Sequence, residues 1–302
     1  MFKPSIFCAA SMVALHAPAA LAQAPASLVQ RIDAAIAPYY QAGEPGAAVI
    51  VTKGGKTVFR KAYGLASLEQ GTPMNADMAQ RIGSVTKQFT AAAILMLAEE
   101  GKLDLSDDIG KHLPGYPAPA QKVTIEHLLT HTSGIPSYTR KHDFQDKQHL
   151  DASVDEMIAT FKDEALDFAP GTRWAYNNSG YYLLGAIIEK VSGKSYADFI
   201  HQRILRPLGM NHTAYEGKDG RVAQASGYSP VKGKLAPSAA LSPTKVYAAG
   251  ALVSTVDDLA RWDAAIASGK LLKPASWKRV FTPYTLADGS STNYGYGWET
   301  GK

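Results

Sequence analysis

A serine and a lysine three residues apart, Ser84 and Lys87, are the first residues of the sequence whose types and spacing could do chemistry. In a helix, residues three apart lie on one face, about 5–6 Å apart at Cβ, so the amine can reach the hydroxyl. The apolar stretch that follows, residues 89–97, would desolvate the lysine and let its neutral amine accept the serine proton. Gly83 allows a tight entry, and a helix N-terminus favours developing negative charge. The pattern predicts a nucleophilic Ser84.

The S-x-x-K spacing alone is a weak signal, because it occurs at two other places. Ser229 with Lys232 and Ser242 with Lys245 repeat it. In both cases a proline follows the serine, and both fall in or beside residues 217–243, which are rich in Gly, Ser, Pro and Lys and predict loops or a weak ribbon. Only Ser84 precedes a long apolar helix, which favours it over the other two.

The second chemical motif is Tyr176-Asn177-Asn178, the only Y-x-N in the chain. It lies between the turn residues Pro170-Gly171 and a predicted helix at residues 179–191. A tyrosine near Lys87 could carry a proton between the serine and a leaving group, and Asn178 could hold a substrate amide. Taken alone, the motif is also explained by a buried tyrosine with a satisfied hydroxyl and a helix-capping asparagine.

Metal and cofactor motifs are not evident. His127 and His131 stand four apart as in a zinc pair, but Leu128 follows His127, so H-E-x-x-H fails and no third ligand is evident. Capping or packing is the favoured explanation for both histidines. The sequence has no G-x-S-x-G elbow, phosphate loop or dinucleotide fingerprint, and we expect no cofactor.

The composition is that of an ordinary globular protein: 302 residues, 46% hydrophobic and 19% charged, with a formal charge of +4 and no lysine- or arginine-rich block. A nucleic-acid partner is therefore not expected.

Residues 1–22 predict a secretory signal peptide. Lys3 precedes an apolar run at residues 6–15, and Ala20-Leu21-Ala22 supplies a cleavage site after Ala22. The run is too short to span about 30 Å of hydrocarbon, and no other stretch of the chain is apolar enough to do so. Cys8, the only cysteine, lies in this segment, so disulfides and thiolate catalysis are excluded for the mature chain. We expect a periplasmic or secreted protein.

Hydrophobic periodicity and turn residues predict the following elements: helices at residues 28–40, 84–100, 125–129, 153–161, 179–191, 196–204 and 255–267, and strands at 47–52, 57–63, 250–253 and 294–298. Strands near both ends with helices between them indicate an α/β (α+β) fold, an antiparallel sheet flanked by helices with a helix-rich insertion. We expect one domain at residues 23–302, with the sheet part at about 23–83 and 245–302 and the helical part at about 84–244.

Several segments together resemble one family, that of class C β-lactamases, D-alanyl-D-alanine carboxypeptidases, D-aminopeptidases and related esterases, the penicillin-binding-protein-like serine hydrolases. The segments are RIGSVTKQFT at 81–90, EEGKL at 99–103, LLTHTSGI at 128–135, FAPG at 168–171, YNNSGY at 176–181, PLGM at 207–210 and AGALVST at 249–255. The resemblance covers about residues 28–302.

The resemblance implies that an ester, peptide or lactam carbonyl acylates Ser84. Lys87 and Tyr176 would remove and return the proton, and Asn178 would help to bind a small-molecule or peptide substrate. Water or another acceptor would then release the acyl group. The sequence does not choose among the three kinds of carbonyl.

The sequence departs from the family at its C-terminal end. The family's third element, a strand bearing Lys or His, one further residue and Gly, lies beyond the region resembling residues 294–298, and this chain ends at Lys302 before it. We therefore expect a truncated chain with an incomplete sheet and an oxyanion donor missing, at a cost of roughly 10²–10³ in rate. The alternative function is a non-catalytic relative that binds peptidoglycan peptides or a partner.

Overall fold

The part of the chain that the structure describes begins with a helix packed on a β-hairpin. A computed structural model describes residues 27–117, 122–217 and 223–301; the predicted signal peptide lies outside them. Helix α1 (Leu28–Ile36) begins at a capping box made by Ser27 and Gln30. It continues only as the 3₁₀ helix Ala37–Tyr39, shorter than the predicted α-helix, because Pro38 has no N–H to donate to the preceding turn.

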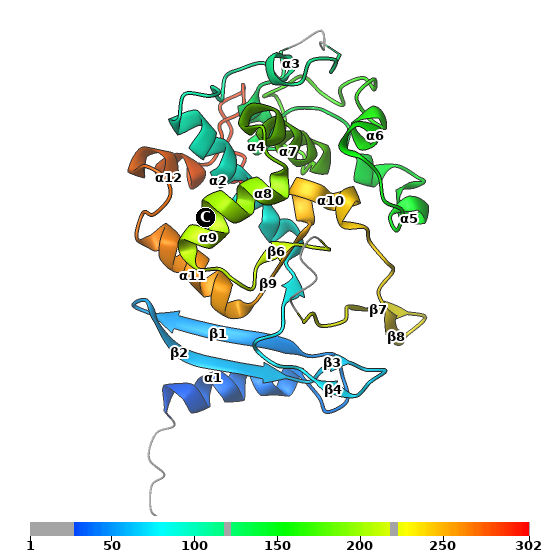
Figure 1. The fold of residues 1–302 in the computed structure, drawn as a ribbon, viewed down its shortest axis with the longest axis vertical. Helices are drawn as coiled ribbons and strands as arrows, with labels where there is room; N and C mark the ends of the chain where they lie inside the picture. Colours follow the sequence, from blue (N-terminus) through cyan, green and yellow to red (C-terminus); the bar gives the residue numbers. More distant parts are fainter. Residues whose placement is uncertain (1–26, 118–121, 218–222, 302) are drawn as a thin grey trace, which may run out of the picture.

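Strands β1 (Ala47–Lys53) and β2 (Lys56–Tyr63) form the predicted hairpin. Gly54 and Gly55 both have positive φ, 57° and 74°, as the two-residue turn requires. Helix α1 contacts β2, while helix α11 (Val256–Ala267) contacts β1 from the other end of the sequence (Figure 1).

A second antiparallel sheet joins distant parts of the chain. Its order is β5 (Gln80–Arg81), β9 (Leu252–Ser254) and β6 (Ala214–Tyr215), with Arg81 paired to Val253. Because β5 ends two residues before Gly83, this small sheet positions the segment that carries Ser84.

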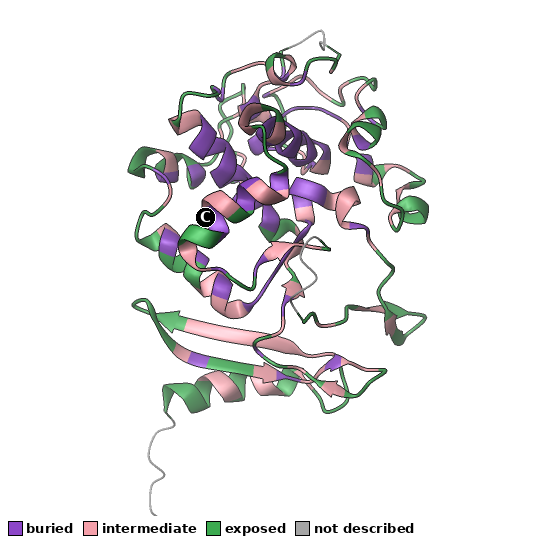
Figure 2. Cartoon of the chain, viewed as in Figure 1, coloured by how far each residue is buried: buried purple, intermediate pink, exposed green. Residues whose placement is uncertain are grey.

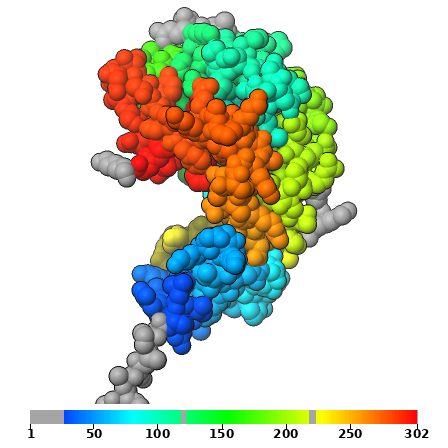
Figure 3. All heavy atoms as spheres, turned by 90° about the vertical axis from the view of Figure 1, so that its left-hand side faces the viewer, coloured from blue at the N-terminus to red at the C-terminus, as the bar shows by residue number. Residues whose placement is uncertain are grey.

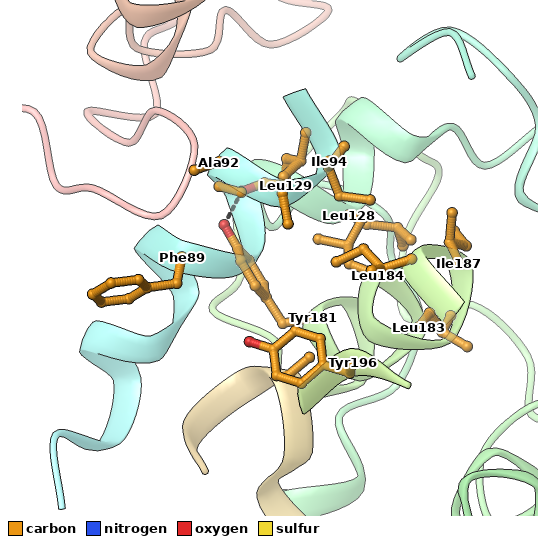
Figure 4. Packing of buried hydrophobic residues seen from close by; sticks show 14 of the residues in the cluster. Phe89, Ala92, Ile94, Leu128, Leu129, Tyr181, Leu183, Leu184, Ile187 and Tyr196 are labelled. Atoms are coloured by element: carbon orange, nitrogen blue, oxygen red, sulfur yellow. Dashed lines mark hydrogen bonds between the residues drawn. The ribbon is translucent and has the colours of Figure 1, made fainter. Parts of the chain in front are cut away.

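The helical part surrounds two helices that are buried on nearly all sides, α2 (Thr86–Glu99) and α7 (Asn178–Ser192). Figure 2 shows this concentration of buried residues, and Figure 4 shows the side chains of α2, α4 (Ile125–Leu129) and α7 meeting in one cluster. Tyr181 crosses the cluster and donates its hydroxyl proton to the Leu129 carbonyl at 2.8 Å. An all-round apolar helix is stable only when others cover it, which explains the helix-rich architecture.

The remaining elements are shorter: helices α3 (Ile109–His112), α5 (Phe144–Lys147), α6 (Val154–Ala159), α8 (Tyr196–Ile200), α9 (Arg206–Leu208), α10 (Pro243–Gly250) and α12 (Pro274–Val280), and strands β3 (Leu65–Ser67), β4 (Thr72–Pro73), β7 (Tyr228–Val231) and β8 (Lys234–Pro237). A π-helical turn, His201–Leu205, follows α8 within the predicted helix at 196–204.

The predicted combination of antiparallel strands with a helix-rich insertion is confirmed. No helix among the residues that the structure describes has the length and apolar character to cross a bilayer.

The predicted strand at 294–298 is wrong. The segment forms one isolated bridge, Tyr294 to Glu299, and the described part of the chain has no strand after β9. Two glycines explain why the backbone packs here without a ladder. A Cβ at Gly295 would lie 2.0 Å from the Val280 carbonyl oxygen, and one at Gly297, where φ is 79°, would lie 2.9 Å from the Lys87 carbonyl oxygen. These glycines allow close approach to α12 and α2.

The prediction of a loop around Ser242 is also wrong. Ser242 is the N-cap of α10, and its hydroxyl accepts the Thr244 N–H. Pro243, the proline that argued against a helix, is the first residue of α10. A missing N–H costs nothing at this position, because the N–H of a first helical residue has no acceptor within the helix.

Candidate active site

Ser84 lies in a short 3₁₀ helix, Gly83–Val85, and the α-helix begins at Thr86 rather than at the serine. Gly83 has φ 50°, a left-handed conformation that favours glycine. Ser84 is exposed, whereas Lys87 is 1% exposed. The spacing still brings the two side chains together, because Lys87 Nζ lies 3.1 Å from Ser84 Oγ.

Three oxygens surround the Lys87 amine. Lys87 Nζ donates to Ser84 Oγ, to Asn178 Oδ1 at 2.9 Å and to the Ala249 carbonyl at 2.8 Å. The three acceptors match the three N–H groups of an ammonium. All are neutral, however, so nothing in this set compensates a buried charge, and burial lowers the pKa of Lys87 to about 7.

Tyr176 completes the arrangement from a segment 92 residues away. Its hydroxyl lies 2.6 Å from Ser84 Oγ, and its ring centroid lies 4.8 Å from Lys87 Nζ. Burial raises the pKa of Tyr176, and the hydrogen bond with Ser84 opposes this only in part. The phenol is therefore neutral when Lys87 loses its proton.

Asn178 is the first residue of α7, and both ends of its amide are engaged within the protein. Besides accepting from Lys87, it donates through Nδ2 to Thr139 Oγ1 at 3.1 Å, and its backbone N–H donates to Ser137 Oγ at 3.2 Å. The capping asparagine is Asn177, whose side chain accepts the Gly180 N–H. In this state Asn178 orients the amine, while its predicted role in substrate binding stays a prediction.

The Ala249 carbonyl is a site group that side-chain motifs did not reveal. Helix α10 is kinked at Tyr247, where φ is 41° and ψ is −129°, and the two carbonyls that follow face α2. Ala248 O accepts from Thr90 Oγ1 at 2.7 Å, and Ala249 O accepts from Lys87. A backbone acceptor has no sequence signature; the only pointer was the resemblance of residues 249–255 to a family segment.

The other S-x-x-K pairs do not form such a site. Ser229 Oγ lies 2.8 Å from Ser238 Oγ across the β7–β8 hairpin. Ser242 donates to Asp151, and Lys245 Nζ lies 3.6 Å from Met157 Sδ. In the described chain, neither lysine amine is hydrogen-bonded to the hydroxyl of the serine three residues before it, although the Lys245 backbone N–H donates to the Ser242 carbonyl as part of the turn that begins α10.

The two histidines act in capping and packing, as the sequence analysis favoured. His127 forms a capping box with Thr124, and His131 is buried after the end of α4. Among the described residues, no group of three His, Cys, Asp or Glu side chains is arranged to hold a metal ion.

Comparison with known proteins places this geometry in a family. A family model described as Beta-lactamase matches residues 26–302. Penicillin-binding protein 4* of Bacillus subtilis is 32% identical over 265 residues, which cover 83% of this chain and 58% of that protein. The solved octameric penicillin-binding protein homologue from Pyrococcus abyssi is 35% identical, with a TM-score of 0.75, over 84% of this chain and 60% of that one. The solved D-stereospecific amidohydrolase from Streptomyces sp. is 29% identical, with a TM-score of 0.71; the match covers 84% of this chain and 77% of that one.

The chain spans less than two thirds of the length of the curated relatives it matches; for penicillin-binding protein 4* the share is 58%. The family match nevertheless covers every residue that the structure describes, including Ser84, Lys87, Tyr176 and Asn178. This chain belongs to the beta-lactamase family, the serine hydrolases whose members include penicillin-binding proteins and amidohydrolases.

Proposed function

We propose that this protein is a serine hydrolase that forms an acyl-enzyme on Ser84 from an amide, lactam or ester carbonyl. The observation that carries the proposal is the contact of one exposed hydroxyl with a buried amine at 3.1 Å and a phenol at 2.6 Å. Both distances suit direct proton transfer.

Lys87 is the general base of this proposal, and Tyr176 is the relay. The pKa of Lys87 is lowered to about 7, whereas that of Tyr176 is raised, so the amine loses its proton at lower pH than the phenol. Neutral Lys87 keeps two N–H donors, one each for Asn178 Oδ1 and Ala249 O, and its lone pair faces the Ser84 hydroxyl. The hydrogen bond between Ser84 and Lys87 then runs from oxygen to nitrogen.

Acylation follows with atoms in balance. Ser84 Oγ attacks the carbonyl carbon as its proton moves to Lys87 Nζ, and the carbonyl π electrons move to oxygen. When the carbonyl re-forms, the bond to the leaving group breaks, and Tyr176 donates its proton to that group while taking one from Lys87. Water, activated by the same groups, releases the acyl chain and restores Ser84.

The helix N-terminus supports the developing negative charge. We assign the Ser84 N–H, in the 3₁₀ helix that leads into α2, as a donor to the carbonyl oxygen that becomes negatively charged. The dipole of α2 adds to this effect.

The relatives support amide and lactam carbonyls as substrates. One relative is a penicillin-binding protein, and another is a D-stereospecific amidohydrolase. The signal-like residues 1–22 support an exported enzyme acting on such substrates outside the cytoplasm.

Labelling with a fluorescent fluorophosphonate and a fluorescent β-lactam tests the proposal. We expect stoichiometric labelling of the protein by at least one probe and none of Ser84→Ala. Ser229→Ala is the matched control, because this serine also precedes a lysine by three residues but lies in the β7–β8 hairpin, away from the site; it should label as the unmodified protein does. Absence of labelling in the unmodified protein would overturn the proposal and favour a peptide-binding relative without catalysis.

A further inference from the structure

His131 occupies a backbone position that disfavours its residue type. It follows the C-cap of α4 with φ 60°, donating its N–H to Leu128 O at 3.5 Å, while Thr132 N–H donates to His127 O at 2.9 Å. These two bonds form a Schellman motif, whose left-handed residue is usually glycine because a β-carbon costs about 1–2 kcal/mol there. A histidine at such a position points to a role for its side chain.

Two hydrogen bonds join His131 to the residues on either side of Tyr176. The Ala175 N–H donates to the His131 carbonyl at 3.0 Å, and the Asn177 N–H donates to His131 Nδ1 at 3.1 Å. The backbone of Tyr176 is thus held at both of its ends by one residue of another segment.

The imidazole also packs on the aromatic rings around the site. It is 1% exposed, and its centroid lies 4.5 Å from that of Tyr176, 4.8 Å from Tyr294 and 5.1 Å from Tyr181. Burial, and after it the charge of Lys87, hold the pKa of His131 well below its usual range. The ring is neutral, so Nδ1 accepts and the proton resides on Nε2.

Nε2 has no hydrogen-bond partner among the described residues, and leaving a buried donor unpaired costs about 1–3 kcal/mol. An apolar ring would avoid this cost, and glycine would avoid the backbone strain. Neither would accept the Asn177 N–H, and this acceptor is what distinguishes histidine at the position.

We propose that His131 is a positioning residue that holds the Tyr176 hydroxyl at Ser84 through the Asn177 amide. This inference rests on the proposed function for its catalytic consequence, but not for the hydrogen bond itself. A displacement of about 1 Å in a reacting group can cost roughly 10² in rate, so loss of the acceptor should lower the acylation rate rather than substrate binding.

Three variants separate the acceptor from the other features. His131→Asn suits the left-handed backbone and places Oδ1 near the position of Nδ1. His131→Gly suits the backbone without an acceptor, and His131→Phe keeps a ring without an acceptor. We expect the Gly and Phe variants to acylate about 10²-fold more slowly at nearly unchanged half-saturating probe concentration, and the Asn variant to stay within about tenfold of the unmodified rate.

Amide hydrogen exchange provides a readout that does not depend on activity. The Asn177 amide should exchange at least about tenfold faster in the Gly and Phe variants and at an unchanged rate in the Asn variant. The Gly171 amide, which donates to Thr132 O beside the same turn, is the internal control and should not change.

Unchanged Asn177 exchange in the Gly variant, or an Asn variant that behaves as the Gly variant does in both readouts, would overturn the positioning role. If the unmodified protein fails to react with any probe, the proposed function fails, and the exchange rates alone still decide whether His131 holds the segment.

Discussion

Lys87 owes its chemistry to burial rather than to an opposite or like charge. Desolvation is the cause of its lowered pKa, and its hydrogen-bond partners are a hydroxyl, an amide and a backbone carbonyl. The rings of Tyr176 and Tyr181, with centroids 4.8 and 5.4 Å away, favour the charged form but do not reverse the shift. An amine that is neutral near pH 7 is the property that the proposed acylation requires.

Removal of the Tyr176 hydroxyl tests the proton relay. Tyr176→Phe should lower the acylation rate by about 10²–10⁴ with little change in binding, because the ring remains and only the proton path is lost. Stopped-flow measurement with a chromogenic ester or lactam gives both quantities. Tyr228→Phe is the control. Tyr228 lies on the distant strand β7, and this change removes a hydroxyl that donates to Glu69. Equal rates in the two variants would contradict the relay.

The lowered pKa of Lys87 also predicts how stability depends on pH. Between about pH 7 and 10.5 the unfolded chain holds a proton on Lys87 that the folded protein lacks, so this residue makes the free energy of unfolding rise with pH. Below pH 7 both states are protonated and the contribution is constant.

Urea unfolding of the unmodified protein and of Lys87→Met measures this contribution, because other titrating groups cancel in the difference. From pH 7 to pH 9, the free energy of unfolding of the unmodified protein should rise relative to that of Lys87→Met by up to about 3 kcal/mol. A difference that stays constant with pH would show that the amine is not desolvated.

At the level of elements, the site depends on how closely α10 approaches α7. A Cβ at Gly185 of α7 would lie 2.3 Å from Tyr247 Cε1 and 2.5 Å from Ala248 Cβ. This glycine therefore permits the contact that places the Ala249 carbonyl at Lys87.

Gly185→Ala should destabilise the protein by about 1–3 kcal/mol and slow the acylation of Ser84, since α10 must move away. Gly180→Ala is the matched control in the same helix, because its nearest neighbour would be Leu128 O at 3.4 Å. Thermal unfolding and probe labelling of both variants check the prediction. A Gly185 variant as stable and reactive as the Gly180 variant would show that this contact does not matter.

The elements that sequence patterns predicted well are those with local causes. Gly54-Gly55 specifies the β1–β2 turn, and apolar runs specify α2 and α7. The kink at Tyr247, the 3₁₀ turn at Ser84 and the irregular segment at 294–298 depend on packing between distant segments, which no local window contains. The contact between Ser84 and Lys87 followed from their spacing on a helix, and the approach of Tyr176 followed from the family resemblance. The Ala249 carbonyl and the Asn177–His131 hydrogen bond became visible only in three dimensions.

On the scale of the whole molecule, the α1–β1–β2 end lies apart from the bulk of the helical part, as Figure 3 shows. Helix α11 contacts β1 and so connects this end to the helical part. The residues of the β1–β2 hairpin are mostly half-buried or exposed (Figure 2). The site groups lie on helices α2, α7 and α10 and on the segments just before α2 and α7, so the geometry of the site does not require the hairpin to contact Ser84.

Export is a whole-molecule prediction. We propose that the protein is secreted across a bacterial inner membrane and cleaved after Ala22, so that the mature chain begins at Gln23. Intact-mass measurement of protein recovered from the periplasm of an expressing bacterium should give this N-terminus. A chain that starts at Gln23 without the signal should remain in the cytoplasm. Recovery of the unprocessed chain from the cytoplasm alone would contradict the proposal.

The pH dependence of Ser84 acylation tests the central claim most directly. In single-turnover reactions with a neutral probe, the rate should rise about tenfold per pH unit below pH 7 and level off above it, following the neutral fraction of Lys87. Lys87→Arg, which keeps a cation that cannot lose its proton, should react about 10²–10³-fold more slowly without this inflection. A flat profile between pH 5.5 and 8.5 in the unmodified protein, or an Arg variant that reproduces its inflection, would contradict the account.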